Sequence, residues 1–341
     1  MVHHIHPSSA KPIQKPSPNR LKMLGMQTGL GLWTAWGAMA LLIHKPMGMA
    51  TYPTIAALTL IYAASIYQPK NTRTMSLVLL LTAISVWLYA QKPSNDRAWQ
   101  DEVAMQLVYE IQGDVVTIQN VRNFEWISET DYVPRWQTRQ YDLAQLDSLD
   151  LILSIWSNDN IAHTLMSFGF ADGERVVFSF EIRKEIGEQF SSIGGFFRQY
   201  EMTLIAADEK DIIYTRSNVR GERVYLYPLS VPKDEMRALF LAYLQAADAL
   251  RHTPSWYNTL SDNCTTAIFD LWRSVRDIPK DYRVLASGRL PEFLMDIGII
   301  DDTQDPKTNK SQAFINPKVQ QYHHQNPITS HDFSKKIRED L

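Results

Sequence analysis

The chain has 341 residues, a formal net charge of −3 and one cysteine, and a chain of this length folds into one or two domains. The near-balanced charge excludes the basic surface that nucleic-acid binding requires, so we expect no nucleic-acid partner. One cysteine excludes an internal disulfide and a cysteine-rich zinc site, and the chain contains no HExxH, P-loop or GxGxxG motif. His3, His4 and His6 lie in an N-terminal tail that we interpret as disordered, so we predict no metal site and no cofactor.

Three uncharged, apolar runs follow the tail, at Met23–Ile43, Pro46–Pro69 and Thr74–Gln91. A membrane-spanning helix needs roughly 20 apolar residues, with a range of about 17–25, and all three runs reach that range. We therefore predict that residues 23–91 form a membrane anchor of three transmembrane helices. Three spans place the tail, residues 1–22, and the large C-terminal region on opposite sides of the membrane.

The basic residues predict which side is which, because short loops rich in Lys and Arg stay in the cytoplasm. Six of them would lie on the side of the tail and three on the opposite side. The six are Lys11, Lys15, Arg20, Lys22, Lys70 and Arg73, and the three are Lys45, Lys92 and Arg97. We therefore expect a multi-pass protein of the bacterial inner membrane, with a cytoplasmic tail and a periplasmic C-terminal region. A cleaved signal peptide is the alternative, but the chain has no A-x-A cleavage site and two further apolar runs follow the first.

Residues 95–300 have the hydrophobic patterns of a mixed domain, and the fold class that we predict is α+β. The predicted strands are Asp114–Gln119, Leu149–Trp156, Ala162–Phe170, Arg175–Arg183, Asp211–Ser217 and Glu222–Pro228. The predicted helices run from Val231 to about Arg251, from Cys264 onward, and from Leu290 to Ile297. The segment 301–341 is polar and aperiodic, and we predict that it is disordered.

The single cysteine, Cys264, lies at the predicted start of a helix. Ser261 or Asp262 is a good N-cap for that helix, and apolar residues follow Cys264 at helical spacing. The unpaired N–H groups and the positive end of the helix dipole at this position favour a thiolate. A lowered thiol pKa is what a nucleophilic cysteine needs. A small buried core residue is the alternative interpretation of Cys264.

Histidine positions favour the nucleophile. Of nine histidines, only His163 and His252 lie within the region that we predict to be folded. His252 ends a predicted helix, where a histidine commonly acts as a favourable cap. His163 lies in a predicted strand, so it is the best available base for the thiol, with an ordinary half-buried strand residue as the alternative.

The predicted hairpin that contains His163 turns near Asp172-Gly173, and opposed residues of an antiparallel pair have a nearly constant index sum. His163 should therefore face about Glu181 or Ile182. Glu181 is the natural acid to hold the imidazole tautomer and stabilise the imidazolium. Ser179 is the other polar candidate, and a solvated charged edge is the alternative interpretation of Glu181.

A strand histidine, a partner on the next strand and a cysteine at a helix start together resemble the circularly permuted branch of papain-like, NlpC-type thiol enzymes. Lecithin:retinol acyltransferase-like enzymes belong to that branch. Four motifs resemble more closely the Lnb N-terminal periplasmic domain family, which is named after a bacterial lipoprotein N-acyltransferase. The motifs are Ala162–Phe168, Phe178–Glu185, Gly195–Glu201 and Asp262–Thr265. The resemblance covers about Asn95 to Ile300.

The resemblance implies a permuted papain-like domain with Cys264 as the nucleophile and His163 as the base. It also implies that Asn263 and Tyr200 line the site and bind substrate. The chain departs from the family in one respect. The acyltransferase looks like a periplasmic domain followed by membrane helices, whereas here the apolar runs precede the domain.

The leading functional hypothesis is thiol-dependent acyl transfer, in which Cys264 takes an acyl chain from a phospholipid and passes it to an amine such as a lipoprotein N-terminus. Backbone N–H groups at the start of the cysteine helix would form the oxyanion hole. The candidates for an apolar lip are Trp256, Tyr257, Phe196 and Phe197. A cysteine amidase or peptidase that acts on peptidoglycan or other cell-envelope peptides has the same geometry and is the first alternative. The second alternative is a non-catalytic membrane-anchored scaffold.

Overall fold

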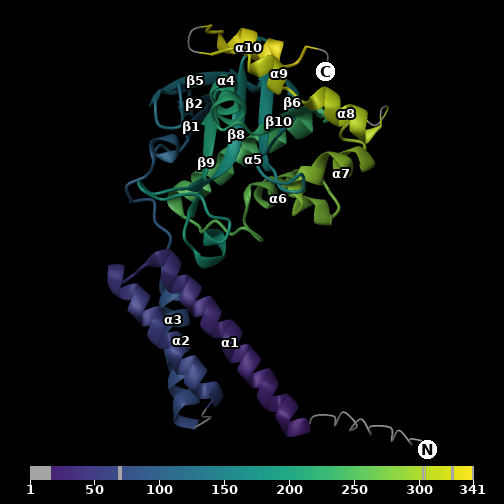
Figure 1. Cartoon of the computed structure of the whole chain (residues 1–341). Helices are drawn as coiled ribbons and strands as arrows, with labels where there is room; N and C mark the ends of the chain where they lie inside the picture. Colours follow the sequence, from purple (N-terminus) through teal and green to yellow (C-terminus); the bar gives the residue numbers. More distant parts are fainter. Residues whose placement is uncertain (1–16, 68–70, 302, 304, 324–325, 340–341) are drawn as a thin grey trace, which may run out of the picture. The chain divides into compact units, whose positions relative to one another are not determined.

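The computed structural model describes residues 17–67, 71–301, 303, 305–323 and 326–339 (Figure 1). The chain divides into two compact units, Met1–Lys92 and Pro93–Leu341, with a boundary inside the interval between the predicted anchor and the predicted domain. His3, His4 and His6 lie outside the described residues.

The first unit is helical and contains α1 (Pro18–His44), α2 (Thr51–Tyr67) and α3 (Asn71–Ala90). Among the described residues, two helical segments are long and apolar enough to cross a membrane, Gly48–Tyr67 and Thr72–Ala90. The prediction of three such helices is therefore met in part, because α1 is long but its polar, glycine and tryptophan residues lower its average hydropathy. The three helices pack on one another, and side-chain hydrogen bonds join them. Trp33 Nε1 of α1 donates to Ser85 Oγ of α3 at 3.1 Å, and the Tyr62 hydroxyl of α2 donates to the Gln27 carbonyl of α1 at 3.1 Å.

The second unit is built on an eight-stranded mixed sheet, as the α+β prediction requires. Along the sheet the strands follow the order β1-β2-β9-β8-β7-β6-β10, and β5 also pairs with β2. Only the pairing of β2 with β9 is parallel. The strands are β1 (Val108–Gln112), β2 (Val115–Arg122), β5 (Trp136–Asp142), β6 (Leu146–Ile155), β7 (His163–Phe170), β8 (Arg175–Arg183), β9 (Glu201–Ala207) and β10 (Arg223–Pro228). A separate short pair consists of β3 (Glu125–Trp126) and β4 (Tyr132–Val133).

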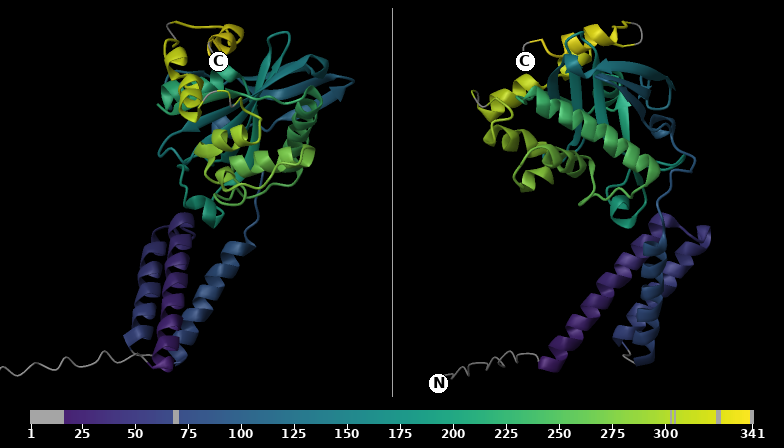
Figure 2. Two further views of the ribbon diagram at one scale, coloured as in Figure 1. Left: turned by 90° about the vertical axis from the view of Figure 1, so that its right-hand side faces the viewer. Right: turned by 180° about the vertical axis from the view of Figure 1, so that it is seen from behind.

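Helices cover both faces of this sheet (Figures 1 and 2). One face packs on α5 (Lys233–His252), α6 (Cys264–Val275) and α7 (Leu290–Asp296), and the other packs on α4 (Glu209–Tyr214), α9 (Asn316–Val319) and α10 (Ser330–Lys336). Each face of the sheet has its own hydrophobic core, because successive side chains of a strand point to opposite faces. On β6, Leu151 and Leu153 lie in the core with α5, whereas Ile152 between them lies in the core with α4.

Most predicted elements are confirmed, and one predicted strand is wrong. Asp211–Ser217 lies in α4 and in the π-helical turn η5 (Thr215–Val219). Asp208 caps α4 by accepting a hydrogen bond from the Lys210 N–H, and the two isoleucines of α4 pack into the core on this face. The β-branched composition of the segment favours a strand, but capping and tertiary packing override that preference.

The prediction that residues 301–341 are disordered is also wrong for the described part of the segment. It contains α8 (Pro306–Ala313), α9 and α10. Four of its apolar side chains are completely buried against the sheet, namely Ile315, Val319, Phe333 and Ile337. Arg338 forms buried ion pairs with Asp150 and Glu209. A few well-spaced apolar residues and one arginine anchor a segment whose overall composition is polar.

We expect Phe333→Ala to destabilise the domain by about 3–5 kcal/mol, because the substitution removes a fully buried aromatic ring. Lys335→Ala on the same helix is the matched control, since Lys335 is exposed. Chemical unfolding of the detergent-solubilised protein measures both. Equal stabilities for the two variants would show that the C-terminal helices do not belong to the folded core.

Candidate active site

Cys264 is the first residue of α6, and its position is defined by a capping box. The Asn263 side-chain oxygen accepts hydrogen bonds from the backbone N–H groups of Thr265 and Thr266, and Asn263 donates its own N–H to the Thr266 hydroxyl. The N-cap is therefore Asn263 rather than Ser261 or Asp262. A buried hydrogen bond of 2.8 Å between the hydroxyls of Thr265 and Thr164 fixes the start of α6 against β7. Cys264 is 7% exposed.

His163 is the first residue of β7 and is also buried. The β7–β8 ladder pairs Met166 with Phe178, so continuation of this register places Glu181 opposite His163, as the index sum predicted. His163 Nε2 lies 2.8 Å from Ser179 Oγ and 3.1 Å from Glu181 Oε1. Both polar candidates on the second strand therefore contact the imidazole, and Nδ1 is the ring nitrogen left for the thiol.

The electrostatics favour a charged pair. Burial raises the pKa of the Cys264 thiol. The His163 charge, a hydrogen bond from His163 and the Thr164 N–H lower it by more, so the net pKa of the thiol is below its ordinary value. Burial and the nearby Arg216 lower the pKa of His163, but the charges of Glu181 and Cys264 outweigh them and raise it to about 9. The two shifts run in opposite directions, and both favour the thiolate–imidazolium pair over the neutral thiol and imidazole.

Arg216 is a part of this site that the sequence analysis missed. Its Nη2 donates to Glu181 Oε1 at 2.8 Å, and the same oxygen accepts the Ser179 hydroxyl at 2.7 Å. Burial raises the pKa of Glu181, but His163 and Arg216 together hold it well below its usual range. Arg216 lies in η5, within the segment predicted as a strand, so the sequence pattern did not place it beside β8.

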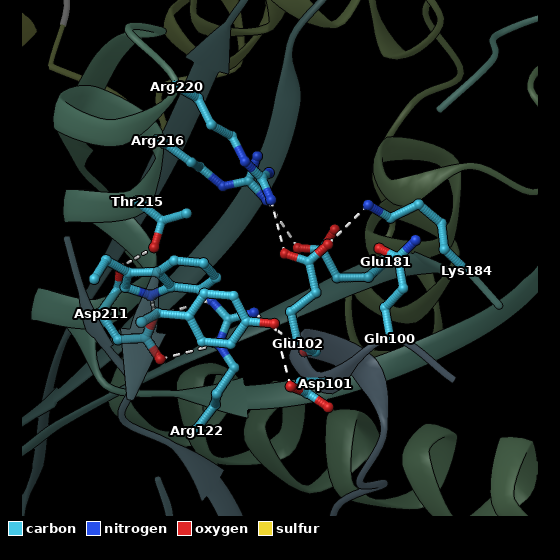
Figure 3. A network of polar contacts seen from close by, with 12 residues as sticks. Gln100, Asp101, Glu102, Arg122, Glu181, Lys184, Asp211, Thr215, Arg216 and Arg220 are labelled. Carbon is cyan, nitrogen blue, oxygen red and sulfur yellow. Dashed lines mark hydrogen bonds and ion pairs between the residues drawn. The ribbon is translucent and has the colours of Figure 1, made fainter. Parts of the chain in front are cut away.

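A cavity of about 1,010 Å³ contains the reactive groups, and Cys264, His163 and Glu181 all line it. Part of its lining is charged, and there Glu102 pairs with Lys184 at 2.8 Å and with Arg220 at 2.7 Å (Figure 3). Another part of the lining is apolar and exposed to solvent. Its side chains are Trp156, Ile161, Ile186, Phe190, Leu260 and Leu285.

Some of the residues that we expected to line the site line the cavity, and others do not. Asn263 lines the cavity, with its side chain committed to the helix cap. Tyr200 does not line it, because the ring is fully buried and its hydroxyl donates to the Gln189 carbonyl at 2.5 Å. Of the four candidates for an apolar lip, Tyr257 lines the cavity, and the other three are not among its lining residues.

The start of α6 offers fewer free N–H donors for an oxyanion hole than we expected from the sequence. The N–H groups of Thr265 and Thr266 are occupied by Asn263, whereas the Cys264 N–H has no acceptor among the described residues. No group of three or more His, Cys, Asp or Glu side chains that could hold a metal occurs in the described part of the chain.

We expect Glu181→Gln to shift the midpoint of Cys264 alkylation by iodoacetamide to a higher pH than in the unsubstituted protein. The reason is that the Glu181 carboxylate raises the pKa of His163, and the imidazolium in turn lowers the pKa of Cys264. Glu185→Gln is the control, because this carboxylate is partly exposed and pairs with Arg97 outside the cavity. An unchanged midpoint in Glu181→Gln would show that Glu181 does not lower the pKa of Cys264 through His163.

Comparison with known proteins identifies one related family. Residues 132–288 match the family model of the Lnb N-terminal periplasmic domain, a range that includes β7, β8, His163 and Cys264. No curated protein and no solved structure matches the chain. The family name and the two apolar helices fit a membrane-anchored protein with a periplasmic domain. Residues 132–288 are therefore similar to the Lnb N-terminal periplasmic domain family, which confirms the resemblance predicted from the four motifs.

Proposed function

We propose that this protein is a membrane-anchored, periplasmic thiol acyltransferase with a permuted papain-like catalytic domain. It moves an acyl chain from a phospholipid through a Cys264 thioester to an amine such as a lipoprotein N-terminus. The observation that carries this proposal is a buried cysteine that interacts with a histidine–carboxylate pair in a cavity whose lining includes exposed apolar side chains.

In the first half-reaction the Cys264 thiolate attacks the ester carbonyl carbon of the phospholipid. The oxyanion that forms accepts a hydrogen bond from the Cys264 N–H, the free donor at the start of α6. The ester C–O bond then breaks, and the His163 imidazolium gives its proton to the leaving alkoxide. The products are a lysophospholipid and an acyl-thioester, with a neutral imidazole beside it.

In the second half-reaction the neutral His163 accepts a proton from the attacking amine. The new C–N bond forms, the C–S bond breaks, and the amide leaves with the Cys264 thiolate restored. Glu181 stabilises the imidazolium in both halves, because its carboxylate stays ionised and in contact with Nε2. The same residues would hydrolyse an amide if water or a peptide bond took these positions, which makes an amidase the alternative.

We extend the proposal to three membrane spans in the inner membrane. The uncharged stretch Met23–Ile43 within α1 is long enough to cross a bilayer, and α1 packs on both apolar helices of its unit. The excess of Lys and Arg in the N-terminal tail and in the loop with Lys70 and Arg73 supports a cytoplasmic tail and a periplasmic domain. A tether of this kind concentrates both lipid substrates near the enzyme.

The decisive test is mass spectrometry of the full-length protein in detergent–phospholipid micelles. We expect a fatty-acyl adduct on Cys264 that disappears when a diacylated lipopeptide is added. Cys264→Ala abolishes the adduct, and His163→Ala slows its formation by about 10²–10⁴-fold, the usual contribution of a general acid–base group. Cys264-dependent cleavage of muropeptides without an adduct would favour the amidase, and a protein inert in both assays would favour a scaffold.

Labelling of introduced cysteines tests the topology. In a Cys264→Ala background, we expect Glu110→Cys, on an exposed position of β1, to react with an impermeant maleimide in intact spheroplasts. Ser9→Cys in the N-terminal tail should react only after the membrane is disrupted, because an odd number of spans separates the two positions. Labelling of both in intact spheroplasts would mean that only two helices cross the membrane.

A further inference from the structure

An exposed apolar surface borders the cavity that contains Cys264. We call this surface the apolar rim and define it by six large side chains that line the cavity and are also exposed to solvent. They are Trp156, Ile161, Ile186, Phe190, Leu260 and Leu285. Ile186 is 71% exposed and Leu260 is 57% exposed. Grouped apolar side chains of this kind mark interaction surfaces rather than ordinary protein exterior.

The rim is assembled from segments that are far apart in the sequence. Trp156 follows β6, Ile161 precedes β7, and Ile186 and Phe190 belong to the connection after β8. The remaining two side chains come from the segments before α6 and after the turn Tyr282–Val284. The Trp156 and Phe190 rings contact edge to face, with centroids 6.0 Å apart. The fold therefore gathers these side chains at the cavity that contains the nucleophile.

The connection between β8 and β9 extends this surface. Residues 189–197 carry no charged side chain, and Ile193 and Phe196 are each about half exposed. The backbone of the connection is held from the inside. The buried Tyr200 hydroxyl donates to the Gln189 carbonyl at 2.5 Å, and the Thr259 hydroxyl donates to the Ser192 carbonyl at 2.7 Å. These bonds fix the backbone while the apolar side chains stay in contact with solvent.

We propose that the apolar rim inserts into a lipid surface, so that an acyl chain passes from the bilayer into the cavity and reaches Cys264. The occupant is lipid because the same chain has two helices of membrane-spanning length, the second ending at Ala90, and the domain begins at Pro93. A bilayer is thus always within reach of the domain. Insertion of the apolar rim into lipid does not depend on catalysis by Cys264. Delivery of the acyl chain to the thiol rests on the proposed acyltransferase function.

Photocrosslinking tests insertion without any dependence on catalysis. The full-length Cys264→Ala protein in phospholipid nanodiscs receives a p-benzoylphenylalanine at position 190, at position 260 or at position 111. Ile111 is the control, because it is an exposed apolar residue on β1 that does not line the cavity. We expect phospholipid adducts at positions 190 and 260 and not at position 111. Equal crosslinking at all three positions, or none at 190 and 260, would overturn the proposal.

Acyl loading in the active protein tests delivery. Phe190→Glu should reduce formation of the Cys264 acyl adduct from bilayer phospholipid by about tenfold or more. This is the effect of losing one aromatic side chain that insertion into lipid would bury. Ile111→Glu should leave it unchanged. Alkylation of Cys264 by iodoacetamide should stay the same in both variants, which shows that the thiol is intact. Undiminished acylation in Phe190→Glu would refute delivery through the rim. Absence of any adduct in the unsubstituted protein would refute the acyltransferase proposal, and the crosslinks would still decide insertion.

Discussion

A carboxylate taken out of water must be compensated by several donors, and Glu181 meets this requirement on a single oxygen. Its Oε1 contacts His163 Nε2, the Ser179 hydroxyl and the Arg216 guanidinium within 2.7–3.1 Å. Arg216 helps to keep Glu181 ionised but also lowers the pKa of His163, so the raised pKa of the imidazole depends on Glu181 and Cys264 acting together. Removal of the carboxylate would leave His163 near the Arg216 cation, whose other ion-pair partner is Glu222 at 3.5 Å, and the pKa of His163 would fall.

Two parts of the backbone bring these groups together. The β7–β8 hairpin supplies His163, Ser179 and Glu181, and strand alternation places the last two on the same face. The π-helical turn η5 brings Arg216 to that face, at the end of α4. Turns of this type occur often at functional sites, because the extra residue redirects a side chain. The capping box at Asn263 then fixes Cys264 at the edge of β7, through the Thr164–Thr265 hydrogen bond.

The groups that the sequence predicted are those defined by local patterns. Hairpin register and helix start placed His163 near Glu181 and Cys264 at an N-terminus, because both follow from turn chemistry and periodicity within short segments. Arg216 and the C-terminal helices were missed for a different reason. Each depends on partners distant in sequence, such as Glu181 for Arg216 and Asp150 for Arg338. The isoleucines of α4 have a strand-like pattern, and only the core between α4 and the sheet decides the outcome.

The charged and the apolar parts of the cavity lining offer a ligand different interactions. In the charged part Lys184 and Arg220 already pair with Glu102, and Arg216 already pairs with Glu181, so an anionic group would compete with carboxylates that are in place. At the apolar rim the exposed side chains gain from any apolar ligand, by about 0.8 kcal/mol for each methylene group buried. A long-chain ester would gain burial along its chain and present a neutral carbonyl to Cys264, and this difference favours the proposed acyl transfer over the alternative of peptide cleavage.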